Sequence, residues 1–270
     1  MSKPRSDSTF TDEVARFYES TLVPLIFEPY ADDLARRARA LDPRAVLEVA
    51  CGTGVVTRAL ARALPDDCAI CATDLNAAMV AHGESVGTAR PVQWRQADVM
   101  ALPFDDDAFD VVVCQFGTMF FPDRPDAYRE VHRALRPGGT FLFNVWKGVE
   151  DNDFARVVTE AVGALYPDDP PLFLARTPHG HGSRAEIEAD VAAAGFASCV
   201  LEPMDAISPA ASPDLPAIAY CQGTPLRGEI EAREPGGLER ATAAATEAIR
   251  ARHGDGPVEG RISAFVVAAR

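Results

Sequence analysis

The chain has 270 residues, of which 47% are hydrophobic, and its formal net charge at pH 7 is −14. This length and apolar content predict one α/β domain with insertions, or two small domains, built around a sizeable core. The negative charge repels phosphate backbones, so we expect no nucleic-acid partner. No apolar run is long enough to span a membrane, and the first residues lack the apolar segment of a secretory signal, which predicts a cytoplasmic protein without a membrane span.

The stretch before the first predicted strand has the pattern of helices. Residues 8–41 include the aromatic-rich stretch "ARFYESTLVPLIFEPYADDL". We expect residues 1–44 to form a helical cap, in which Tyr18 and Tyr30 close over a bound ligand.

From about residue 44 to residue 147, short β-rich runs alternate with helical segments. The expected strands are "AVLEVA", "AICATDL", "VQWRQAD", "FDVVVCQF" and "GTFLFNVW". The expected helices are "GVVTRALARAL", "NAAMVAHGES" with Asn76 as its N-cap, and "RPDAYREVHRAL", which "RPGG" should end. This alternation is typical of a mostly parallel sheet with helices on both faces.

A long insertion separates the last two predicted strands, "FASCVLEPM" and "RISAFVVAA". Before them, Ser183 and Glu186 have the spacing of a capping box at a helix start. Residues 209–256 carry two predicted helices, "AIAYCQGTPLRGEIEAR" and "LERATAAATEAIRARHG". An insertion of this length is more often a lid than a bare loop. We expect a core of residues 45–208 and 257–270, with the insertion as a lid and not an independent domain.

The six cysteines are scattered through mostly apolar stretches. Cys68 and Cys71 have a spacing seen in metal sites, but they lie in a predicted buried strand and no second pair follows. We therefore expect reduced core cysteines and no metal site.

A glycine turn, "GTG" at residues 52–54, follows the first predicted strand. Glycine admits a left-handed backbone and the close approach of a ligand, and the helix that follows offers unpaired N–H groups. Glu48, Asp74 and Asp98 lie at or near the carboxyl ends of the first three predicted strands. Because ligands of open α/β sheets bind at that edge, these acids are predicted to line one crevice.

The acids limit the choice of ligand. Asp74 occupies the place where a dinucleotide enzyme keeps an acid for ribose hydroxyls, so NAD is one candidate. That fingerprint favours glycine or alanine where Thr57 stands, and Glu48 would repel a pyrophosphate. A cationic ligand that has ribose and adenine but no phosphate fits better, and S-adenosylmethionine has these features.

A resemblance to a known family is carried by four segments, which are "VLEVACGTG", "ATDLN", "QADVMALPFDDDAFDVVVCQFGTMFFPD" and "EVHRALRPGGTFLFNVW". In this order and spacing they resemble class I S-adenosylmethionine-dependent methyltransferases, in the type 11 group that is similar to ubiquinone/menaquinone C-methyltransferases. The resemblance covers about residues 45–147. It implies a Rossmann-like α/β fold with a seven-stranded, mostly parallel sheet whose last strand is antiparallel, and methyl transfer to a small molecule. Ala50 stands where the family usually has a glycine, and we expect a slightly shifted loop that still binds the cofactor.

The resemblance also implies which residues hold the cofactor. Asp74 would accept from the ribose hydroxyls, Asp98 from the adenine amine, and Glu48 would bond the glycine loop or the methionine amine. The other expected cofactor contacts are Ala50, Cys51, Gly52, Thr53, Gly54, Leu75, Met79, Val99, Gln115 and Phe116. Core packing is the alternative for Leu75 and Met79, and a turn cap is the alternative for Asp98.

Contacts to the methyl acceptor are expected outside these motifs. The apolar side chains after the fourth strand should line a pocket for an apolar or aromatic metabolite, with core packing as the alternative. The Gly/Pro-rich loop "FLARTPHGHGS" should supply polar contacts, with a solvated loop as the alternative. The expected acceptor contacts are Tyr18, Tyr30, Met119, Phe120, Phe121 and Arg176, with His179 or His181 as polar anchor or general base.

Several alternatives stay open at this point. The segment 221–225, "CQGTP", is either a helix boundary or part of the pocket wall. A non-catalytic protein that binds S-adenosylmethionine and, less favoured, an NAD-dependent oxidoreductase are the rival functions. The sequence is compatible with methylation of oxygen, nitrogen, sulfur or carbon, and with a monomer or a homodimer.

Overall fold

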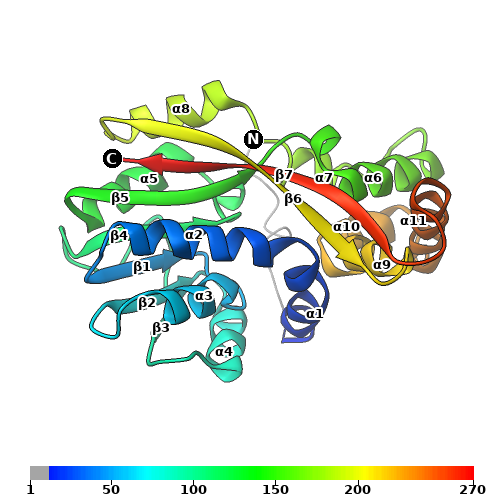
Figure 1. Cartoon of the computed structure of the whole chain (residues 1–270). Helices are drawn as coiled ribbons and strands as arrows, with labels where there is room; N and C mark the ends of the chain where they lie inside the picture. The colour runs from blue at the N-terminus through cyan, green and yellow to red at the C-terminus, as the bar shows by residue number, and fades with distance from the viewer. Residues whose placement is uncertain (1–11) are drawn as a thin grey trace.

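The computed structural model describes residues 12–270 and has one seven-stranded sheet at its centre (Figure 1). The strand order is β3-β2-β1-β4-β5-β7-β6. The strands are β1 (Ala45–Val49), β2 (Ala69–Asp74), β3 (Gln93–Gln96), β4 (Phe109–Gln115), β5 (Leu135–Trp146), β6 (Cys199–Ala210) and β7 (Val258–Ala269). Neighbours from β3 to β5 are parallel, whereas β7 is antiparallel to β5 and β6. The predicted sheet with an antiparallel last strand is confirmed.

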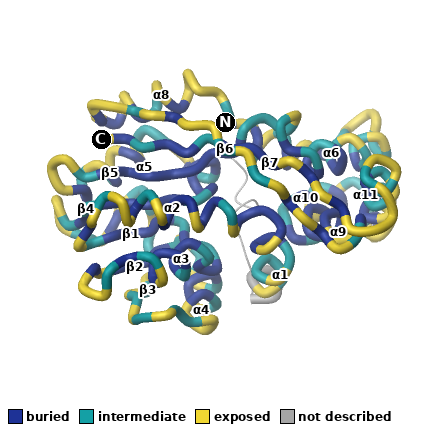
Figure 2. The backbone as a smooth tube through the Cα atoms, viewed as in Figure 1, coloured by how far each residue is buried: buried dark blue, intermediate teal, exposed yellow. Residues whose placement is uncertain are grey.

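Helices cover both faces of this sheet because successive residues of a strand point to opposite sides. On β1, Val46 packs in a cluster with α2 (Glu28–Ala40) and α3 (Val55–Ala63), whereas Leu47 packs with α5 (Arg124–Ala134) and α8 (Arg184–Ala193). Figure 2 shows the central strands as mostly buried between these layers. The near-continuous apolar runs of the central strands thus follow from burial on both faces.

The N-terminal segment is helical, as predicted, but it contains one turn of π-helix. α1 (Asp12–Leu22) leads into this turn, Val23–Phe27, and then into α2; the predicted helical residues 8–11 lie outside the described residues. Pro24 has no backbone N–H to donate within the turn. The other four side chains of the turn are buried, so it points apolar residues toward the interior.

The insertion holds three helices rather than two: α9 (Asp214–Gly223), α10 (Leu226–Arg233) and α11 (Leu238–His253). The break falls at Thr224, which is extended and precedes Pro225. The residue before a proline avoids the helical region, which explains the interruption. α6 (Asp153–Leu165), which the sequence patterns did not indicate, packs with α9 and α11.

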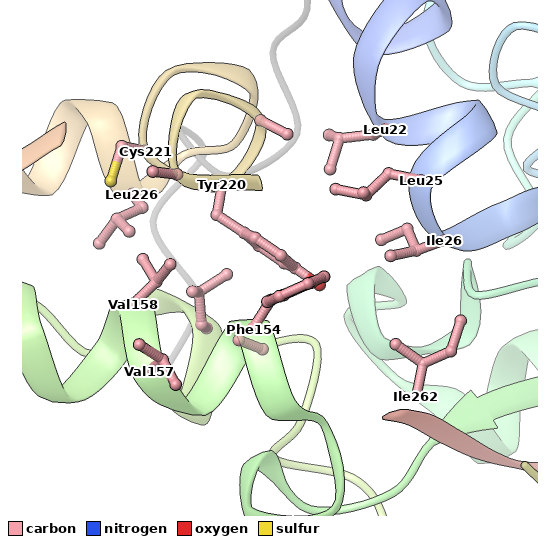
Figure 3. Close-up of a cluster of buried hydrophobic side chains, with 14 of the residues drawn as sticks. Leu22, Leu25, Ile26, Phe154, Val157, Val158, Tyr220, Cys221, Leu226 and Ile262 are labelled. Atoms are coloured by element: carbon pink, nitrogen blue, oxygen red, sulfur yellow. The ribbon is translucent and has the colours of Figure 1, made fainter. Parts of the chain in front are cut away.

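The helices of the insertion, α6 and the N-terminal segment share one hydrophobic cluster. Figure 3 shows the Tyr220 ring of α9 lying between Leu22 and Ile26 of the N-terminal segment and Phe154 of α6. β6 and β7 are also longer than predicted, because they pair continuously over twelve residues each and reach out to these helices (Figure 1).

Local signals had mixed outcomes. Asn76 caps α4 (Ala77–Val86) by accepting from the Ala78 N–H, as predicted. Ser183 precedes α8, but its side chain makes no capping hydrogen bond, so the predicted capping box is wrong. α5 ends at Ala134, just before "RPGG", and that segment belongs to β5. All six cysteine thiols are free, and five of them are buried. Within residues 12–270, no helix is long and apolar enough to cross a membrane.

Candidate cofactor and acceptor site

A cavity of about 770 Å³ lies at the carboxyl ends of β1, β2, β3 and β4. Its roof comes from α1, the π-helical turn and α9, and its far wall from α7 (Phe173–Arg176) and the loop after it. Cavities of this size hold drug-sized ligands. The predicted crevice at the strand ends therefore exists, and it extends to α9 of the insertion.

The glycine loop after β1 makes a tight turn with left-handed backbone at three residues. The φ angles are 53° at Ala50, 54° at Gly52 and 86° at Gly54. The N–H groups of Cys51 and Gly54 donate to the carbonyl oxygens of Thr73 and Cys51, both at 2.9 Å. Ala50 adopts the conformation that suits a glycine, and its methyl group packs against Gly117. The turn is therefore retained with alanine, at a backbone cost of roughly 1–2 kcal/mol.

Asp74, at the end of β2, links the loop to the cavity. Its two carboxylate oxygens accept hydrogen bonds from the backbone N–H groups of Gly52 and Asn76, both at 2.8 Å. Burial raises the pKa of Asp74 above its usual value, and these two hydrogen bonds oppose the rise only in part. The side chain also lines the cavity, where a second lone pair on each oxygen can accept from a ligand hydroxyl.

Glu48 lies behind the loop instead of in the cavity wall. Its side chain is buried and accepts a hydrogen bond from the hydroxyl of Thr57. Burial raises the pKa of Glu48 to about 8. Thr57, which stands where a dinucleotide-binding motif favours glycine or alanine, thus serves here as the hydrogen-bond donor to Glu48.

Most of the expected cofactor contacts meet at the cavity. Leu75 lines it with 55% of its surface exposed, which is unusual for core packing, whereas Met79 lines it from a buried position. Asp98 lines it and also accepts from the Met100 N–H, so the turn-cap alternative holds as well. The expected residues that line the cavity are Ala50, Gly52, Asp74, Leu75, Met79, Asp98, Val99, Gln115 and Phe116. The expected residues that lie behind its wall are Glu48, Cys51, Thr53 and Gly54.

An aromatic residue with strained backbone, Phe116, directly follows β4 and lines the cavity. Phe116 has a φ of 50°, which is rare for a bulky side chain. Its ring stacks on Trp146 with centroids 3.7 Å apart, and Tyr30 packs edge-on against both rings. Strained backbone of this kind gathers at ligand sites. Tyr30 itself is fully buried and donates to the Met204 carbonyl, so it does not reach the cavity; this corrects its expected role as an acceptor contact.

Beyond Phe116 most of the residues that line the cavity are apolar. Met119, Phe120 and Phe121 line it as expected, together with Tyr18 of α1. The sequence patterns missed further lining residues, which are Leu22, Ile26, Phe27, Trp146, Asn152, Phe173, Leu174, Pro178 and Tyr220. Gly223, Thr224 and Pro225 of the "CQGTP" segment also line the cavity. Trp146 is the last residue of β5, so the expectation that ligands bind at the carboxyl ends of the strands could have identified it. The "CQGTP" segment is both a helix boundary and part of the wall.

The two histidines of the "HGH" loop have separate surroundings. His179 is buried and lines the cavity, and burial lowers its pKa to about 4. His181 lies outside the wall, with Nε2 at 3.6 Å from a carboxylate oxygen of Asp190 in α8. Arg176 pairs with Glu229 of α10 and also lies outside the wall. His181 and Arg176, which were expected to contact the acceptor, thus lie outside the cavity wall, next to acids of α8 and α10.

Comparison with known proteins identifies the family. A family model described as a methyltransferase domain matches residues 47–143. A ubiquinone/menaquinone biosynthesis C-methyltransferase, UbiE, from Hahella chejuensis is 37% identical over 101 residues, which are 36% of this chain and 41% of that protein. The chain thus spans about two fifths of the length of the first curated relatives it matches.

Two further matches cover much more of the chain. The demethylmenaquinone methyltransferase of Mycolicibacterium paratuberculosis is 31% identical over 207 residues, which are 72% of this chain and 86% of that protein. The crystal structure of the YcgJ protein from Bacillus subtilis superposes with a TM-score of 0.56 at 18% identity, covering 89% of this chain and 97% of that one, which shows a shared fold. The chain therefore belongs to the class I S-adenosylmethionine-dependent methyltransferases, in the group that is similar to UbiE.

Proposed function

We propose that this protein transfers a methyl group from S-adenosylmethionine to a small apolar or aromatic acceptor. The observation that carries the proposal is one cavity with two chemically different halves. Carboxylates and the glycine loop line the half at the ends of β1, β2 and β3. Aromatic and aliphatic side chains line the half beyond Phe116, under the lid helices.

The first half suits the cofactor. Asp74 and Asp98 offer carboxylate oxygens to ribose hydroxyls and an adenine amine, and Leu75 offers an exposed apolar surface. A Cβ atom added at Gly52 would meet no atom within 4 Å, so the loop leaves open space next to its backbone. Arg124 is the sole basic side chain among the described lining residues apart from His179, and it pairs with Asp190. A ligand without phosphates matches this set better than a dinucleotide.

When bound, the cofactor supplies a methyl group that is already activated on a sulfonium. The residues of this chain then need only hold the two reactants in line, and well-oriented reactants gain roughly 7–11 kcal/mol from positioning. Phe116 and Trp146 line the cavity just after β4 and at the end of β5, and we place the methyl group beside them, where it would meet the acceptor.

We also propose that the helices around residues 209–256, with the N-terminal helical cap, form a lid over the core of residues 45–208 and 257–270. α9 contributes Tyr220 and Gly223 to the cavity wall, and α1 contributes Tyr18. This cover would exclude water from the reacting atoms.

The relatives suggest the first acceptor to test. One of them is named for methylation of demethylmenaquinone, whose ring is a naphthoquinone, and an apolar half-cavity suits such a ring. The test is transfer of a labelled methyl group to 1,4-dihydroxynaphthalene under reducing conditions, with a metabolite extract as the unbiased screen. Binding of S-adenosylhomocysteine is measured by calorimetry in parallel. Binding without transfer to any acceptor would favour the non-catalytic alternative, and binding of NAD instead would favour the oxidoreductase.

A further inference from the structure

His179 is placed at the wall of the apolar half-cavity by a turn that follows α7. The residue is 8% exposed, and its ring centroid lies 5.9 Å from that of Trp146. Phe173 and Leu174 of α7 line the same wall. Because the imidazole ring lies in a mostly apolar wall, few groups can form hydrogen bonds with it, and the hydrogen-bond partner of each ring nitrogen can be assigned.

The protein determines which nitrogen of His179 carries the proton. Nδ1 lies 2.9 Å from the carbonyl oxygen of Lys147, and a carbonyl oxygen can only accept. Nδ1 must therefore be the N–H donor, although the side-chain nitrogen of Asn152 also lies 3.4 Å from it. That nitrogen of Asn152 has other acceptors in the carbonyl oxygens of Gly148 and Ser263, at 3.0 and 3.3 Å. With the proton on Nδ1, Nε2 keeps its lone pair.

Among residues 16–270, whose side chains the structure describes, Nε2 has no hydrogen-bond partner, and His179 lines the cavity. Burial lowers the pKa of His179 to about 4, so the ring stays neutral at physiological pH. The nearby hydroxyls of Tyr18 and Tyr220 stay protonated, because burial raises the pKa of each phenol well above its usual range. The carboxylates of the cavity lie in its other half, so Nε2 is the unprotonated base of the acceptor half.

We propose that His179 selects an aromatic acceptor that carries a hydroxyl group, by accepting a hydrogen bond from that hydroxyl at Nε2 and taking its proton during methyl transfer. This inference rests on the proposed function and narrows the acceptor class. It favours acceptors whose methylation releases a proton over thioethers and tertiary amines, which have no proton to lose.

The step balances in atoms and charge. The acceptor O–H bond breaks and its proton goes to Nε2, while the electron pair stays with the acceptor. That pair forms the bond to the methyl carbon, at oxygen or at a conjugated ring carbon that afterwards returns its own proton to the oxygen. The electron pair of the broken sulfur–carbon bond stays on sulfur, which loses its positive charge. His179 then holds two protons and releases one to water as the product leaves.

The test compares two ligands that differ in one proton, 1-naphthol and 1-methoxynaphthalene. Their dissociation constants are measured with the protein saturated with S-adenosylhomocysteine, for the wild type and for His179→Asn. The asparagine amide can still donate to the Lys147 carbonyl, but it has nothing at the position of Nε2. We expect affinity for 1-naphthol to fall about tenfold in the variant, as for one hydrogen bond, while affinity for 1-methoxynaphthalene stays nearly unchanged. His132→Asn, the same exchange at an exposed position of α5, is the control.

A second measurement uses the wild type alone. The ¹⁵N resonance of Nε2 should move on addition of 1-naphthol and not on addition of 1-methoxynaphthalene. Equal losses for both ligands in His179→Asn, an unmoved Nε2 resonance, or failure of the wild type to bind 1-naphthol would each overturn the inference. If S-adenosylhomocysteine itself does not bind, the proposed function fails; if it binds and the ligand difference is absent, only the role of His179 fails.

Discussion

Gly54→Ala should lower the free energy of unfolding by more than the cost of a left-handed alanine, because the added methyl group also clashes with a neighbouring ring. Gly54 has a φ of 86°, and a Cβ atom there would lie 2.6 Å from Cη2 of Trp94. The other side of the Trp94 ring already packs closely on the backbone of Gly83 in α4, where even an added Cβ would lie only 2.7 Å from Cζ3. The ring therefore has no room to move toward α4. The indole is thus held between two glycines, and the extra methyl group must displace the cofactor loop.

Gly195→Ala is the control for this change. Gly195 follows the last turn of α8, where helices commonly end in a left-handed residue; its φ is 94°, and an added Cβ would meet no atom within 4 Å. A left-handed alanine costs roughly 1–2 kcal/mol, so this variant should lose about that much unfolding free energy. Gly54→Ala should lose a further ~1–3 kcal/mol, the usual cost of overpacking.

The assay is denaturant unfolding of both variants, with calorimetry of S-adenosylhomocysteine binding beside it. Gly54→Ala should also weaken ligand affinity, which Gly195→Ala should leave intact. In a Trp94→Phe background the extra loss at Gly54 should shrink, because the clashing ring atoms are gone. Equal losses for the two alanine variants, or no relief from Trp94→Phe, would refute the argument from the indole.

Four other variants or measurements test the site and lid. Asp74→Ala should weaken S-adenosylhomocysteine binding about tenfold to a hundredfold, because hydrogen bonds to a charged group are worth roughly 1.5–3 kcal/mol; an unchanged calorimetric dissociation constant removes Asp74 from the site. Because the pKa of Glu48 is raised to about 8, its contribution to stability is fully present below about pH 4.5 and is lost as the pH rises through about 8, so Glu48→Gln should gain melting temperature relative to the wild type between pH 5 and 8.5. A constant difference between the two proteins across that range contradicts this linkage. Glu229 accepts from the Leu172 and Phe173 N–H groups, so Glu229→Gln should loosen α7 and weaken 1-naphthol binding, while cofactor affinity stays the same; parallel losses of both affinities would argue against this role. Hydrogen exchange of residues 209–256 should slow when S-adenosylhomocysteine binds, and equal exchange with and without it would make the insertion a peripheral decoration.

Local patterns predicted the part of the molecule that holds the cofactor. The alternation of buried strands and helices, the glycine turn at residues 52–54 and the acid that ends β2 all depend on backbone preferences and apolar periodicity within short windows. Parallel strands bring their carboxyl ends to one edge, so strand order alone sufficed to gather Asp74, Asp98 and Gln115. These predictions needed no knowledge of distant contacts.

The acceptor half of the cavity depends on contacts between segments that are far apart in the chain. Phe27 lies near Trp146, and Tyr220 packs between the N-terminal segment and α6, which no short window could reveal. The two histidines of one loop differ because a backbone carbonyl and a side-chain amide lie next to His179, whereas acids of α8 lie near His181. Sequence alone determined the residue types and the strand framework; tertiary packing decided which side chains face the ligand, because burial and hydrogen-bond partners are properties of the assembled core.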